Sequence, residues 1–145
     1  MEVPSNLMGE EYAMTLLFDI IPSELERILG DGAYALALKI ASRAVANVLE
    51  LNGSEYTDLA RIFKELLGDM ITDIAFEGNE MVIMTNINAS SEAQRGALAG
   101  IFVGILKALG YNAIAPKRPI RLPRSYAKVV VQGSKVLITL PDRSH

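Results

Sequence analysis

The sequence predicts a single α+β domain spanning residues 1–145, an antiparallel sheet with helices packed on it and a glycine-rich helix at its centre. Three observations favour this class. A chain of 145 residues is long enough to bury a proper core. Segments with helical periodicity and segments typical of strands both occur along it. Finally, Gly96, Gly100 and Gly104 recur at every fourth position of an otherwise helical segment.

The first half of the chain is predicted to hold one strand followed by helices. The strand is expected at 14–21, and the helices at 22–29, 33–51 and 55–67. Ser23 and Glu26 have the spacing of a capping box, which predicts Ser23 as the N-cap of the first helix. Gly53 follows the second helix as a C-terminal signal, and Ser54 is expected to cap the third.

The second half is predicted to place strands on both sides of one long helix. The strands are expected at 70–76, 81–88, 111–115, 126–132 and 135–140. Gly78-Asn79 and Gly133-Ser134 are turn signals that predict two hairpins. Ser91 and Gln94 form a capping box at the start of the helix, and Gly110 ends it.

Small residues form a regular row on each of two predicted helices. The rows are Gly96, Gly100 and Gly104 on the later helix, and Ala33, Ala37 and Ala41 on the earlier one. Each glycine inside a helix costs about 1 kcal/mol relative to alanine, so close packing is expected to offset that cost. Two such rows allow two helix axes to approach closely. The later helix is also apolar on most other sides, which predicts a central position in the domain or in a dimer.

The composition excludes several kinds of chemistry. The chain has no cysteine, which rules out disulfides, thiolate metal sites and cysteine nucleophiles. The one histidine is the last residue, His145, so a histidine base, haem ligand or zinc site is not expected. No strand–GxGxxG–helix fingerprint for a dinucleotide occurs. The sequence therefore predicts neither a cofactor nor a metal site, and a binding function is preferred over an enzyme.

Charge is divided unevenly along the chain. Residues 1–106 hold six bases and sixteen acids, whereas 107–145 hold eight bases and one acid. Four bases lie in a basic, proline-rich loop at 116–125: Lys117, Arg118, Arg121 and Arg124. This loop is either a solvated connector that folds back on the acidic body or a site for an anion or protein partner. No helix-turn-helix or aromatic platform accompanies the bases, so nucleic acid is not the expected partner.

Membrane insertion is not expected. The segment 96–115 has the length of a span, but Lys107 lies near its middle, where a lysine costs about 2.5–3.5 kcal/mol on insertion scales. Residues 1–11 carry three acids and no base, the reverse of a signal peptide. The chain is therefore expected to be cytoplasmic.

The order of these elements resembles the 4-vinyl-reductase domain family over residues 13–115. The resemblance rests on the helix opening at Pro22-Ser23, the alanine-rich helix, the helix at Ser54, the hairpin, and above all the helix that contains Gly96-Ala97-Leu98-Ala99-Gly100. It implies a fold similar to the core subunits of the TRAPP transport particle and to haem-dependent nitric-oxide sensors. It also implies a dimer that binds a small, hydrocarbon-like molecule. The cysteine pair usual in the family is missing here, as is an internal histidine.

Half of the residues are hydrophobic, and an apolar ligand cavity, a subunit interface or a large alanine-rich core would account for this excess. Six residues are candidates for lining a cavity between helices and sheet: Tyr34, Leu38, Phe76, Leu98, Phe102 and Leu106. The alternative for each is a filled core. The expected function is thus non-catalytic, regulatory binding of a small hydrophobic ligand by a homodimer. The alternative is a ligand-free dimeric adaptor resembling TRAPP subunits.

Overall fold

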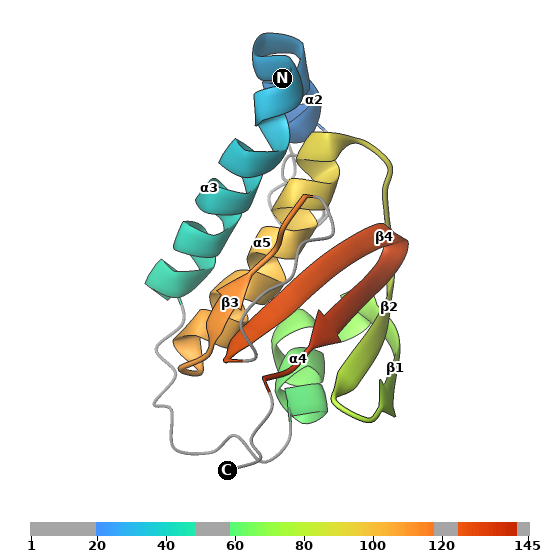
Figure 1. Cartoon of the computed structure of the whole chain (residues 1–145). Coiled ribbons are helices and arrows are strands. Elements are labelled where there is room, and N and C mark those ends of the chain that lie inside the picture. The colour runs from blue at the N-terminus through green and yellow to red at the C-terminus, as the bar shows by residue number, and fades with distance from the viewer. Residues whose placement is uncertain (1–19, 49–58, 118–124, 142–145) are drawn as a thin grey trace.

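The computed structural model describes residues 20–48, 59–117 and 125–141, and these form an α+β fold as predicted (Figure 1). The elements in chain order are helix α2 (Ile21–Leu29), the 3-10 turn η2 (Gly30–Gly32), helix α3 (Ala33–Val48), helix α4 (Leu59–Leu67), the 3-10 turn η3 (Gly68–Met70), strands β1 (Ile71–Glu77) and β2 (Glu80–Ala89), helix α5 (Glu92–Ala108), and strands β3 (Asn112–Ile114) and β4 (Tyr126–Thr139).

The sheet is mixed, whereas the sequence predicts an antiparallel one. Its strand order is β1-β2-β4-β3, with β1 and β4 both antiparallel to β2. β3 pairs in parallel with the start of β4, where Ala113 lies opposite Ala127. The parallel pair arises because the connection after β3 is long enough to return the chain to the end of the sheet from which β3 started.

β4 corresponds to the predicted C-terminal hairpin, but the structure has one continuous strand there. Its first residues pair with β3, and the stretch from Gly133 to Thr139 pairs with β2. Gly133 has a φ of 62°, and the ribbon turns back on itself in this region (Figure 1). The chain therefore reverses direction at the predicted Gly133-Ser134 turn, although residues 126–139 are assigned to a single strand element. The other hairpin, β1–β2, turns at Gly78 as predicted, with a φ of 65°.

The start of α2 differs from the prediction. α2 begins at Ile21, one residue before the predicted Pro22, and Ile20 is its N-cap with no side-chain cap bond, so Ser23 is not the cap. The Glu26 carboxylate instead accepts hydrogen bonds from the N–H groups of Glu92 (2.7 Å) and Ala93 (3.4 Å), at the start of α5. Of the predicted strand at 14–21, residues 14–19 lie outside the described residues, as do the predicted helix end at 49–51 and the predicted cap Ser54.

Both ends of α5 follow the local sequence signals. Ser91 and Gln94 form the predicted capping box. At the other end, Tyr111 N–H donates to the Leu106 carbonyl (2.9 Å) and Gly110 N–H to the Lys107 carbonyl (3.0 Å), while Gly110 has a φ of 96°. This is a Schellman motif, which terminates a helix where glycine supplies the left-handed residue.

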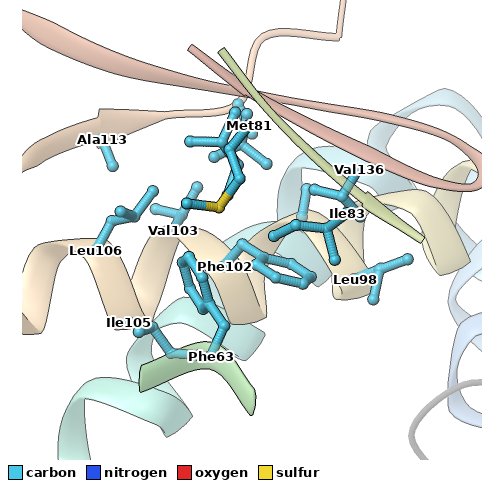
Figure 2. Packing of buried hydrophobic residues seen from close by; sticks show 14 of the residues in the cluster. Phe63, Met81, Ile83, Leu98, Phe102, Val103, Ile105, Leu106, Ala113 and Val136 are labelled. Carbon is cyan, nitrogen blue, oxygen red and sulfur yellow. The ribbon is translucent and has the colours of Figure 1, made fainter. Parts of the chain in front are cut away.

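α5 lies between the sheet and α3, in the central position that the sequence predicts (Figure 1). Its sheet-facing residues share one apolar core with α4 and the inner faces of β2 and β4. Figure 2 shows the Phe102 ring in this core beside Phe63, Ile83 and Leu98. The rings of Phe63 and Phe102 have centroids 5.2 Å apart and are tilted by 58°, a geometry that aromatic pairs favour.

The opposite side of α5 is a seam of close contact with α3. A Cβ on Gly100 would lie 2.6 Å from the Leu38 carbonyl oxygen and 2.7 Å from the Ala41 Cβ. A Cβ on Gly104 would lie 2.8 Å from the Val45 Cβ, and one on Gly96 would overlap the Tyr34 carbonyl oxygen. Only glycine fits these three positions at this separation of the helices.

Candidate functional site

An open groove runs between α3, α5 and β3, with a volume of about 330 Å³. We call it the α3–α5–β3 groove. Its lining is mainly apolar and consists of Leu38, Lys39, Ser42, Val103, Lys107, Ala113, Ile114, Ala115 and Pro116. In Figure 1, β3 lies over α5 with α3 on one side and β4 on the other.

The glycine seam sets the position of the groove walls. Leu38 and Ser42 are four residues apart on α3, and the carbonyl oxygens of both lie close to the seam, at Gly100 and Gly104. Val103 and Lys107 are likewise four residues apart on α5, so each pair shares one face of its helix. The groove therefore begins directly beside the line along which the two helices touch.

Tyr34 holds the wall of the groove that β3 and the residues after it form. Its hydroxyl donates a hydrogen bond to the Ala115 carbonyl oxygen at 2.9 Å, and the side chain is buried. Burial raises the pKa of Tyr34 above its usual value of about 10, although the nearby positive charge of Arg95 acts in the opposite direction. The hydroxyl thus stays protonated at neutral pH. It ties α3 to the segment that follows β3.

The polar part of the groove is positively charged. Among the described residues, Lys39 on α3 and Lys107 on α5 are the charged residues of its lining, and none of the lining residues is acidic. Within the described residues, neither lysine forms an ion pair. The Ser42 hydroxyl donates to the Lys39 carbonyl oxygen at 3.2 Å, which leaves the lone pairs of its oxygen available as acceptors.

The six residues considered as cavity lining do not come together. Leu98, Phe102 and Leu106 are fully buried in the core between α5 and the sheet. Phe76 lies on the edge strand β1 and is 52% exposed. Leu38 lines the groove, and Tyr34 contributes to it through its hydrogen bond with Ala115.

The two small-residue rows lie on the helices that form the seam, and Ala41 is the member of the α3 row nearest to a seam glycine. Ala41 contacts the seam at Gly100. Ala33 and Ala37, however, form a separate small cluster with Ala93, against which Ala97 packs. The atoms nearest to Gly96 belong to the Tyr34 backbone.

The basic loop can be placed only at its start. Lys117 forms an ion pair with Glu92 at 2.7 Å, which links the loop to the first turn of α5. Arg118, Arg121 and Arg124 lie outside the described residues. This one contact agrees with a basic segment that folds back on the acidic body.

Across residues 20–48, 59–117 and 125–141, no group of three or more histidine or acidic side chains could hold a metal ion. No helix in that part of the chain has both the length and the apolar character needed to cross a bilayer.

Comparisons with protein-family models, curated proteins and solved structures find no match to this chain. Its function must therefore be inferred from the site.

Sequence reasoning missed most of the groove. Lys39, Ser42, Val103 and Ile114 carry no motif, and their proximity depends on how α3 crosses α5. Lys107 is the one lining residue that stands out in the sequence, since it is the only charged residue in the apolar segment 96–115. We interpreted that charge as evidence against a membrane span, and it also marks the polar rim of the groove.

Proposed function

We propose that this chain binds a small, hydrocarbon-like molecule in the α3–α5–β3 groove without catalysing a reaction, in a regulatory role. The observation that carries the proposal is the apolar lining of the groove, supplied by Leu38, Val103, Ala113 and Ile114, next to a rigid helix seam. The resemblance of residues 13–115 to the 4-vinyl-reductase domain family supports the same function.

The dimensions of the groove favour a small ligand. Small-molecule sites range over about 300–1,000 Å³, so a volume of about 330 Å³ is at the lower end of that range. Each methylene group that a ligand buries contributes about 0.8 kcal/mol. A straight chain of a few carbons therefore supplies measurable affinity.

Calorimetric titration with octan-1-ol tests this function, because the probe is uncharged and carries a flexible apolar chain. We expect saturable binding with one site per chain. Ser42→Trp places an indole in the groove and should abolish the binding. Asn47→Trp is the matched control, since Asn47 is an exposed residue of the same helix outside the groove lining. If octan-1-ol fails to bind, or if Ser42→Trp binds it as well as the wild type does, the proposal is wrong.

A second candidate function, a dimeric adaptor, is favoured by exposed apolar residues on α2 and α3. Ile28 is 71% exposed and Ile40 is 51% exposed, and Leu36 lies one turn before Ile40. Leu36 and Ile40 share one face of α3, and exposed large apolar side chains on one face are typical of interaction surfaces. Light scattering coupled to size exclusion should then report a dimer that Ile40→Glu converts to a monomer. A wild-type monomer across the accessible concentration range would exclude the homodimer.

A further inference from the structure

The two lysines of the groove are unexpected if its ligand is a plain hydrocarbon. The chain as a whole has a net charge of −3, and residues 1–106 are strongly acidic. The groove nevertheless carries two positive charges, from Lys39 and Lys107, and within the described part of the chain no acidic residue lines it. A hydrocarbon without a polar atom would make no polar interaction with either ammonium group.

The placement of these lysines suits a ligand with two chemical ends. The aliphatic part of a lysine side chain lies along apolar surface while its ammonium group remains in water. Lys39 comes from α3 and Lys107 from α5, so both helices of the seam contribute a lysine to the lining of the groove. Leu38, Val103 and Ile114 provide the apolar surface between them and β3.

We propose that the ligand is a carboxylate-bearing amphiphile, a molecule with one anionic carboxylate and a short hydrocarbon tail. Lys39 and Lys107 bind the carboxylate, and the apolar residues of the groove bind the tail. This inference rests on the proposed function and adds the chemical class of the ligand. Charge complementarity of this kind contributes specificity, because it favours the anion over neutral and cationic molecules with the same tail.

Four probes separate the contributions of head and tail. Octanoate, octan-1-ol and octan-1-amine share one tail length and differ in the charge of the head, whereas acetate keeps the carboxylate and lacks the tail. We expect octanoate to bind about tenfold more tightly than octan-1-ol, which corresponds to about 1.4 kcal/mol. Octan-1-amine should bind more weakly than octan-1-ol, and acetate should show no measurable binding.

The double variant Lys39→Met/Lys107→Met tests the assigned residues. Methionine keeps an unbranched apolar side chain and removes the charge, so octanoate should lose about tenfold in affinity relative to octan-1-ol in this variant. The preference for octanoate should disappear. Lys64→Met is the matched control, because Lys64 is an exposed lysine on α4, outside the groove. It should keep the full preference. In 0.5 M salt the preference of the wild type should fall, since exposed charges are screened.

The outcomes are distinct. If octan-1-ol and octanoate bind equally, the groove is an apolar site and the proposed carboxylate selectivity is wrong, while the proposed function stands. The inference is also overturned if the preference survives in the double lysine variant, or if acetate binds as tightly as octanoate. If octan-1-ol does not bind, the proposed function itself fails, whatever the result for octanoate.

Discussion

Replacing Gly100 with alanine tests the close approach of α3 and α5. An added Cβ would lie 2.7 Å from the Ala41 Cβ, well inside the optimum of about 3.5–4.0 Å for two carbon atoms. It would also lie 2.6 Å from the Leu38 carbonyl oxygen. Neither neighbour can rotate away, because one is backbone and the other is a methyl group fixed to the helix. The helices themselves would have to move apart.

The magnitude follows from two opposing effects. Alanine gains about 1 kcal/mol over glycine from helix propensity. Overpacking typically costs about 1–3 kcal/mol, and the rigid neighbours at Gly100 place this site in the upper part of that range. We therefore expect Gly100→Ala to lower the free energy of unfolding by about 1–2 kcal/mol. Gly96→Ala should cost more. Gly104→Ala should cost slightly less, because the nearest atoms, the Val45 Cβ at 2.8 Å and the Ser42 carbonyl oxygen at 2.9 Å, lie farther from an added Cβ than those at Gly100.

Urea unfolding monitored by far-UV circular dichroism measures these differences, with an unchanged m-value as the check on two-state behaviour. Gly32→Ala is the control, because a Cβ there would meet only the Leu29 Cβ at 4.0 Å. That variant should be neutral or gain about 0.4–1 kcal/mol from the reduced freedom of the unfolded chain. If Gly100→Ala gains stability in the same way, the glycines do not set the separation of the helices, and the reasoning is refuted.

Three further predictions concern single side chains. Because burial raises the pKa of Tyr34, the contribution of its neutral hydroxyl to stability is complete below about pH 10 and is lost as the pH rises further. Urea unfolding from pH 8 to 12 should therefore show that the wild type is more stable than Tyr34→Phe up to about pH 10 and loses this difference only at higher pH. Phe102→Ala should destabilise by about 3–5 kcal/mol, whereas Phe76→Ala should change thermal stability by about 0.5 kcal/mol or less; similar losses for both would contradict the assigned burial. Glu26→Ala removes the hydrogen-bond acceptor at the start of α5 and should lower the free energy of unfolding in urea by about 0.5–2 kcal/mol, whereas Glu26→Gln should lower it less. If Glu26→Ala is as stable as the wild type, Glu26 does not cap α5.

Local signals predicted the fold well where neighbouring residues satisfy them. Ser91 and Gln94 cap α5 as predicted, and Gly110 ends it, because both interactions close within one helical turn. Ser23 and Glu26 have the same spacing, yet Glu26 caps a different helix. The partial positive charge and the unpaired N–H groups at the N-terminus of α5 stabilise the Glu26 carboxylate there, and only the tertiary structure brings Glu26 to that helix end.

The candidate site was less predictable than the fold. The regular row Leu98, Phe102 and Leu106 predicts a buried face, but periodicity does not distinguish a filled core from a cavity wall. Phe76 has a large apolar side chain of the kind that is usually buried, but it is exposed because β1 is an edge strand. Lys39 and Lys107 are far apart in sequence, so their presence on one groove depends on the glycine seam between α3 and α5.

The location of ligand binding is the most direct test of the central claim. Uniformly ¹⁵N-labelled protein titrated with octan-1-ol should show progressive shifts of the backbone amides of Leu38, Ser42, Val103 and Ala113, with saturation at one ligand per chain. Shifts centred on the exposed residues of α2 and α3 around Ile28 and Ile40, or the absence of any saturable shift, would contradict a ligand site in the α3–α5–β3 groove.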